Sequence, residues 1–200
     1  QASAVPFIED RLGHAGGRMS RKAILTIGMG FCAGLAQAET VIAALGDSLT
    51  QGFGLPIEQG FVPQLQAWLE AEGHNVRLIN AGVSGDTTSG GLSRVDWTLT
   101  EDVDAMIVAL GGNERLRGID PALSRANLDG ILRAASGREV DVLLIGMEAP
   151  GNYGPEYKAD FDAKYPDLAA KYQTLYLDSI FAGFGDLASD AAGARAFMQP

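Results

Sequence analysis

The chain has 200 residues, of which 46% are hydrophobic and 20% are charged, so it can bury a core within one domain. Its net charge of −10 argues against a nucleic-acid partner, because the phosphate backbone attracts basic surfaces. One cysteine excludes a scaffold held by disulfides, and two histidines make a histidine-rich metal site hard to build.

The N-terminal part of the chain has the pattern of a secretory signal peptide. Met19 is followed by a basic pair, an apolar stretch over residues 23–36 and a small-x-small site at 36–38. The apolar stretch is shorter than the roughly 20 residues that a membrane span needs. We therefore expect upstream sequence at 1–18, a signal peptide at 19–38 and a periplasmic or secreted protein without a stable membrane anchor. The alternative is a buried N-terminal helix.

Short apolar runs and helical periodicity alternate along residues 39–200. Strands are predicted at 41–45, 75–80, 105–110, 140–145 and 174–177, and helices at 61–73, 87–99, 121–137 and 157–172. In the last helix, Pro166 predicts a break or a restart. Strands that alternate with helices indicate parallel pairing with helices on both faces, so we predict one doubly wound α/β domain.

Three glycine-marked turns directly follow the first three predicted strands. They read Gly-Asp-Ser-Leu-Thr at 46–50, Gly-Val-Ser-Gly-Asp-Thr at 82–87 and Gly-Gly-Asn-Glu at 111–114. The carboxyl ends of parallel strands share one edge, and with a strand order of 2-1-3-4-5 the first and third strands flank the switch point where ligands bind. A serine on such a turn presents its hydroxyl as a nucleophile. The N–H groups of Ser48 and Gly85 and the amide of Asn113 can then stabilise an oxyanion.

Each of these turns is a weak signal alone, because Gly-Asp-Ser is a common turn sequence. A phosphate-binding loop is the main rival, but neither G-x-G-x-x-G nor G-x-x-x-x-G-K is present. The order of the three turns after three successive strands favours acyl-transfer chemistry.

The three turns resemble blocks I, II and III of the SGNH (GDSL) hydrolases. The Arg-Gly-Ile at 117–119 and the segment 149–154 are similar to the periplasmic acyl-CoA thioesterase, lysophospholipase and arylesterase subgroup, and the resemblance covers residues 40–200. It implies a flavodoxin-like three-layer sandwich with about five parallel strands in the order 2-1-3-4-5. It also implies Ser48 as the nucleophile, an oxyanion hole of Ser48, Gly85 and Asn113, and no metal or cofactor.

The fourth block of the family, Asp-x-x-His, supplies the general base and its carboxylate. The chain contains His14, upstream of the signal pattern, and His74, in a turn expected at the opposite edge of the sheet. The family's block would begin after Pro200, so we expect a fragment that lacks this block and the last helix. We further expect residues 39–200 alone to be nearly inactive, because losing a triad member costs on the order of 10⁴ in rate.

Four further residues are candidates for the substrate pocket. Glu114 stands where most relatives have Asp, which affects the placement of Asn113, and Met147, Pro150 and Tyr153 follow the fourth strand at the same edge. An equally good interpretation of these last three is a surface loop capped by an aromatic ring.

The leading hypothesis is a serine hydrolase of small-molecule acyl esters or thioesters. A carbohydrate O-acetylesterase is an alternative within enzymes. An inactive acyl- or lipid-binding protein is an alternative outside enzymes, because the base is missing from the recognisable motifs. A flavodoxin-type cofactor carrier would share the fold but would be coloured when purified.

Overall fold

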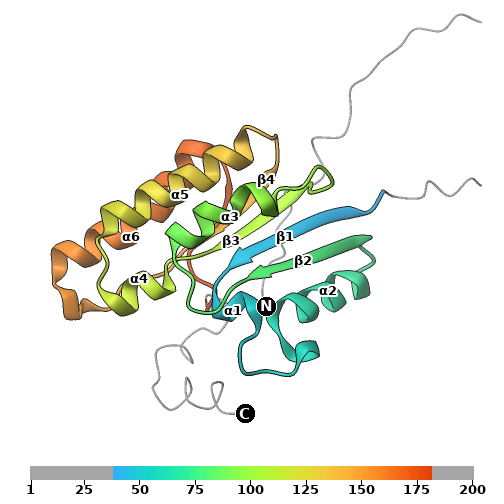
Figure 1. Ribbon diagram of the computed structural model, residues 1–200, viewed down its shortest axis with the longest axis horizontal. Helices are drawn as coiled ribbons and strands as arrows, with labels where there is room; N and C mark the ends of the chain where they lie inside the picture. Colours follow the sequence, from blue (N-terminus) through green and yellow to red (C-terminus); the bar gives the residue numbers. More distant parts are fainter. Residues whose placement is uncertain (1–37, 182–200) are drawn as a thin grey trace, which may run out of the picture. The chain divides into compact units, whose positions relative to one another are not determined.

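The computed structural model describes residues 38–181 (Figure 1). The predictions for residues 1–37, including nearly all of the signal pattern and His14, lie outside the described residues. The strands are β1 (Thr40–Gly46), β2 (Val76–Gly82), β3 (Ala105–Ala109), β4 (Asp141–Ile145) and β5 (Leu175–Leu177). The helices are α1 (Ser48–Gln51), α2 (Phe61–Ala71), α3 (Thr88–Thr98), α4 (Gly112–Arg117), α5 (Pro121–Ser136) and α6 (Pro155–Tyr172), with single 3₁₀ turns η1 (Ile57–Gln59) and η2 (Gly151–Tyr153).

The strands form one parallel sheet in the order β2-β1-β3-β4-β5. This confirms the predicted doubly wound topology. In its register, Gly46 pairs with Gly82 on one side and with Ala109 on the other. The three glycine-marked turns therefore start at the same level of the sheet, at its carboxyl edge.

Helices cover both faces of the sheet, as the predicted three-layer sandwich requires. On one face, α3, α5 and α6 pack over a large core in which Leu45, Val108 and Leu144 are fully buried. On the other face, α1 and α2 pack beside β2, and Val62 of α2 joins a smaller core with Ala44. Such apolar burial is the main stabilising contribution to a domain of this kind.

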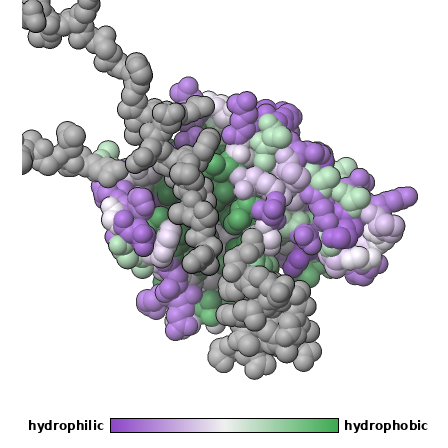
Figure 2. Space-filling view, turned by 180° about the vertical axis from the view of Figure 1, so that it is seen from behind, coloured by the Kyte–Doolittle hydropathy of each residue, from purple (hydrophilic) through white to green (hydrophobic). Residues whose placement is uncertain are grey.

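The second face keeps apolar surface near β5. Leu175 and Leu177 lie in register with Leu143 and Ile145 of the smaller core, yet they are 71% and 37% exposed. Figure 2, which views the side opposite to Figure 1, shows apolar residues between hydrophilic margins. The helices described here therefore leave part of the sheet's apolar surface uncovered.

The prediction of a helix break at Pro166 is wrong. Helix α6 runs without interruption from Pro155 to Tyr172 with Pro166 inside it. An internal proline removes one backbone hydrogen bond and costs about 3 kcal/mol. Here Phe161, Tyr165 and Leu168 are buried in the core on both sides of the proline, and this packing holds the helix together.

None of the helices within residues 38–181 combines the length and the hydropathy that crossing a membrane requires.

Candidate active site

Ser48 is the first residue of α1, directly after β1. The preceding residue, Asp47, caps the helix by accepting a hydrogen bond from the Leu49 N–H at 3.0 Å. Burial raises the pKa of Asp47, which is only 4% exposed. The first N–H groups of a helix have no partner within it, so the Ser48 N–H is available at this edge of the sheet.

Gly85 occupies a tight turn after β2. The Asp86 N–H closes the turn on the Val83 carbonyl at 3.1 Å, and the Ser84 N–H donates to Gln51 Oε1 at 2.8 Å. Neither bond uses the Gly85 N–H. The φ of Gly85 is +76°, a conformation that glycine adopts more readily than other residues, which explains the glycine in this motif.

Arg94 of α3 connects the first two turns. Its Nη2 donates to the Gly46 carbonyl at 2.9 Å, its Nη1 to the Ala81 carbonyl at 2.5 Å, and its Nε to the Asp86 carboxylate at 2.8 Å. The Arg94 side chain is 22% exposed, so this ion pair is partly desolvated. Sequence reasoning missed Arg94. The only signal was an arginine two helical turns after Asp86.

Asn113 of α4 is joined to the second turn. Its Nδ2 donates to the Asp86 carbonyl at 2.7 Å. The guanidinium of Arg117 donates to Asn113 Oδ1 at 3.5 Å and to the Gly85 carbonyl at 3.3 Å. A carboxamide has two N–H groups, so Asn113 keeps a second one beside the bond to Asp86.

The third turn also approaches the first. A Cβ atom at Gly112 would lie only 2.8 Å from Asp47 Oδ2, so a larger residue there would have to displace the Asp47 carboxylate. Together with the bonds to Asp86, this contact shows that the three turns meet in space. The structure thus brings Ser48, Gly85 and Asn113 to one edge, while their catalytic roles remain predictions.

Glu114 points into the interior. It is 1% exposed, and its Oε1 accepts hydrogen bonds from the Thr88 N–H at 2.6 Å and from Thr88 Oγ1 at 2.7 Å. The Asn127 amide donates to the same hydroxyl at 3.1 Å. These contacts join the turn that carries Asn113 to the start of α3, and contact between Glu114 and a substrate stays a prediction.

A buried lysine lies on the same side of the sheet as Glu114. Lys164 is 0% exposed, and its Nζ lies 2.9 Å from the centroid of the Phe161 ring and 4.7 Å from that of Tyr165. Burial lowers the pKa of Lys164 to about 7, although the nearby charge of Glu114 opposes this shift. Lysine is rarely fully buried, so the sequence analysis did not predict a lysine in the core.

The remaining pocket candidates lie after β4. Met147 is buried against the third turn, with its Sδ 3.6 Å from the position of a Cβ at Gly112, whereas Pro150 is exposed. Tyr153 is 39% exposed, and its hydroxyl donates to the Leu116 carbonyl at 3.0 Å. Tyr153 therefore packs over α4, and its role as a lining residue remains a prediction.

His74 lies between α2 and β2, where its N–H donates to the Leu69 carbonyl at 3.0 Å. It is exposed and precedes β2, so it lies at the amino edge of the sheet, away from Ser48. Residues 38–181 contain no group of three His, Cys, Asp or Glu residues that could hold a metal ion.

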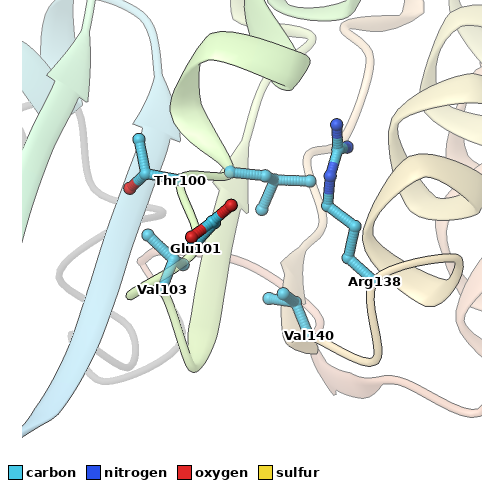
Figure 3. A pocket seen from close by; sticks show the side chains of 6 residues that line it. Thr100, Glu101, Val103, Arg138 and Val140 are labelled. Atoms are coloured by element: carbon cyan, nitrogen blue, oxygen red, sulfur yellow. The ribbon is translucent and has the colours of Figure 1, made fainter.

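A hollow of about 340 Å³ lies at the amino edge as well (Figure 3). Thr100, Glu101 and Val103 line it before β3, and Arg138 and Val140 line it before β4. It contains none of the residues of the three turns.

Comparison with known proteins identifies the class to which a sheet with these turns belongs, namely hydrolases that act on ester bonds. The model of the GDSL-like lipase/acylhydrolase family matches residues 44–198. The chain belongs to this family.

Named proteins resemble this chain in sequence or in structure. Esterase TesA of Pseudomonas aeruginosa is 40% identical over 151 residues, covering 75% of each chain. The thioesterase 1/protease 1/lysophospholipase L1 of Escherichia coli is 32% identical over 143 residues, covering 71% of this chain and 67% of its own length. The structure of AlinE4, an SGNH-hydrolase family esterase, superposes with a TM-score of 0.72 at 38% identity, covering 81% of this chain and 92% of AlinE4.

Proposed function

We propose that Ser48 is the nucleophile of a hydrolase of acyl esters and thioesters. The Ser48 Oγ attacks the carbonyl carbon of the substrate, and its proton passes to a general base. The tetrahedral intermediate then collapses, the alcohol or thiol leaves, and water releases the carboxylic acid from the acyl-enzyme. The observation that carries this proposal is the junction of the three turns around Asp86, Asp47 and Gly112.

The oxyanion hole consists of the Ser48 and Gly85 N–H groups and the Asn113 amide. Hydrogen bonds hold two of these donors in place. The Asn113 side chain is bonded to the Asp86 carbonyl and to Arg117, and Gly85 lies within a turn that a backbone hydrogen bond closes. Donors fixed before the reaction stabilise the developing charge without reorganisation.

The general base lies outside residues 38–181 in this proposal. The one histidine among the described residues, His74, is at the opposite edge of the sheet. A neutral serine hydroxyl is a weak nucleophile, so turnover requires a base from outside residues 38–181.

We propose small-molecule acyl esters and thioesters as substrates, so that the leaving group is attached through oxygen or sulfur. The relatives are named as an esterase, an arylesterase and a thioesterase/lysophospholipase, and these names favour acyl ester cleavage over carbohydrate deacetylation or acyl binding without hydrolysis. The signal pattern at 19–38 supports a periplasmic or secreted location, which fractionation of the native host would test.

Hydrolysis by the full-length natural protein tests this function. Rates are measured on p-nitrophenyl esters from acetate to dodecanoate, on acyl-CoA and on acetylated xylan, for the wild type and Ser48→Ala. We expect cleavage of acyl esters that falls by on the order of 10⁴ in Ser48→Ala. Exclusive cleavage of acetylated xylan, or equal rates in both proteins, would contradict the proposal.

A further inference from the structure

Four large apolar side chains project into solvent directly after the nucleophile. They form what we name the apolar rim: Leu49, Phe53, Leu55 and Ile57, which are 49%, 72%, 47% and 81% exposed. Figure 1 shows α1 and the segment after it beyond the arrowheads of β1 and β2, at the carboxyl edge. Scattered exposed apolar residues are ordinary, but four within nine consecutive residues, directly after the proposed nucleophile, mark a candidate interaction surface.

Backbone hydrogen bonds order the segment that carries the apolar rim. The N–H groups of Gly52 and Phe53 both donate to the Ser48 carbonyl at 3.0 Å, and the Leu55 N–H donates to the Gly52 carbonyl at 3.1 Å. Further along, the Gly60 N–H closes η1 on Ile57 at 3.1 Å. The apolar side chains are therefore presented by ordered turns, so little conformational entropy is lost when a partner binds.

Charge identifies the kind of partner. Residues 49–57 contain no charged side chain, although the chain carries a net charge of −10. An anionic surface would repel this protein, and a basic surface would find only Glu58, which directly follows the segment in η1. A zwitterionic lipid surface has no net charge and accepts apolar side chains at the boundary between its headgroups and acyl chains.

We propose that the apolar rim docks the protein reversibly on zwitterionic lipid surfaces, with Ser48 facing the lipid. This inference rests on the proposed function for its biological purpose: acyl lipids that reside in membranes or micelles would reach Ser48 without first dissolving in water. It differs from a stable membrane anchor, because a few partly inserted side chains give only weak, reversible binding.

Flotation with phosphatidylcholine vesicles tests the docking without any turnover. The full-length protein is compared with the double variant Phe53→Ser/Ile57→Ser and with the control Trp97→Ser, which removes an 86% exposed aromatic side chain near the C-terminal end of α3. Circular dichroism melting shows that each variant is folded. We expect the bound fraction to fall at least about fivefold in the double variant and to stay unchanged in the control.

The proposal is overturned if the wild type does not float, if the double variant floats as well as the wild type, or if binding occurs only to anionic phosphatidylglycerol vesicles. A rim that contacts another protein instead would give the first of these results. Ester hydrolysis is assayed separately on a water-soluble ester. Loss of hydrolysis with intact flotation would reject the proposed function and leave the docking standing.

Discussion

The two edges of the sheet carry different kinds of polar contact. At the carboxyl edge, Arg94 and Asn113 each bond to backbone carbonyls and connect turns that are distant in the sequence. At the amino edge, Arg77 pairs with Glu39 and Asp102 across side chains that are 44% to 56% exposed. The first kind holds in place the turns that carry the proposed oxyanion donors, whereas exposed pairs of the second kind contribute little stability. The proposed active site is therefore marked by hydrogen bonds between turns and not by a hollow, since the hollow of Figure 3 lies at the amino edge.

Of the substitutions that test the difference between the two edges of the sheet, Asn113→Ala has the largest expected effect. It removes one proposed oxyanion donor and its bond to the Asp86 carbonyl. We expect kcat to fall by on the order of 10²–10³ with a small change in KM, because the lost interaction acts in the transition state. Steady-state kinetics on a soluble ester measures this, and a change confined to KM would speak against an oxyanion role.

Arg94→Gln tests whether the connection between the first two turns matters for rate. The variant leaves the Asp86 carboxylate without its cation and weakens the bonds to Gly46 and Ala81. We expect kcat to drop by about 10–100-fold and stability by about 3 kcal/mol, since one partner of a partly buried ion pair is removed. Urea unfolding and kinetics separate the two effects. An unchanged kcat in the folded variant would reduce Arg94 to a structural role.

Lys164→Met tests how a buried ammonium group affects the stability of the core below the carboxyl edge. Because the pKa of Lys164 is lowered from its ordinary 10.5 to about 7, the unfolded chain binds this proton more tightly than the folded one between these values. The stability of the wild type therefore rises as pH increases from about 7 to about 10.5, and the cost of burying the charge is fully present below pH 7. Glu114, Asp162 and Arg125 are the charges that act on this site.

We expect Lys164→Met to raise stability by about 1–3 kcal/mol at pH 6 and to have a much smaller effect at pH 10. Thermal melts of both proteins across this pH range measure the difference. Destabilisation at pH 6 would show instead that the ammonium contributes favourable contacts with the rings of Phe161 and Tyr165.

Arg138→Gln at the amino edge has the smallest expected effect and serves as the matched control for Arg94→Gln. Its ion pair with Asp96 spans 2.9 Å between side chains that are 41% and 72% exposed. We expect a stability change below about 0.5 kcal/mol and unchanged kinetics. A loss of rate comparable to that of Arg94→Gln would remove the distinction between the two edges.

The sequence predicted the parts of the fold that local patterns control. Short apolar runs predicted all five strands, and the motifs predicted the three turns because each follows a strand directly. The order of the strands was implied by the resemblance to the SGNH hydrolases. Long-range contacts were out of reach. Arg94 bonds to Gly46 across 48 residues, and no local signal marks that distance.

At two residues, tertiary packing outweighs the preference that the local sequence would indicate. Lysine is rarely buried, so nothing in the sequence placed Lys164 in the core beside Phe161. Proline normally ends a helix, yet the buried neighbours of Pro166 hold α6 together. In both cases the decisive contribution comes from tertiary contacts that one sequence does not display.

The most direct test of the account is covalent trapping of the nucleophile. The full-length natural protein is treated with a fluorophosphonate and digested, and the modified peptide is sequenced by mass spectrometry. We expect a single adduct on Ser48 that is absent from Ser48→Ala and that blocks ester hydrolysis. Ester hydrolysis that persists with Ser48 unmodified, or an adduct on another serine that abolishes activity, would contradict it.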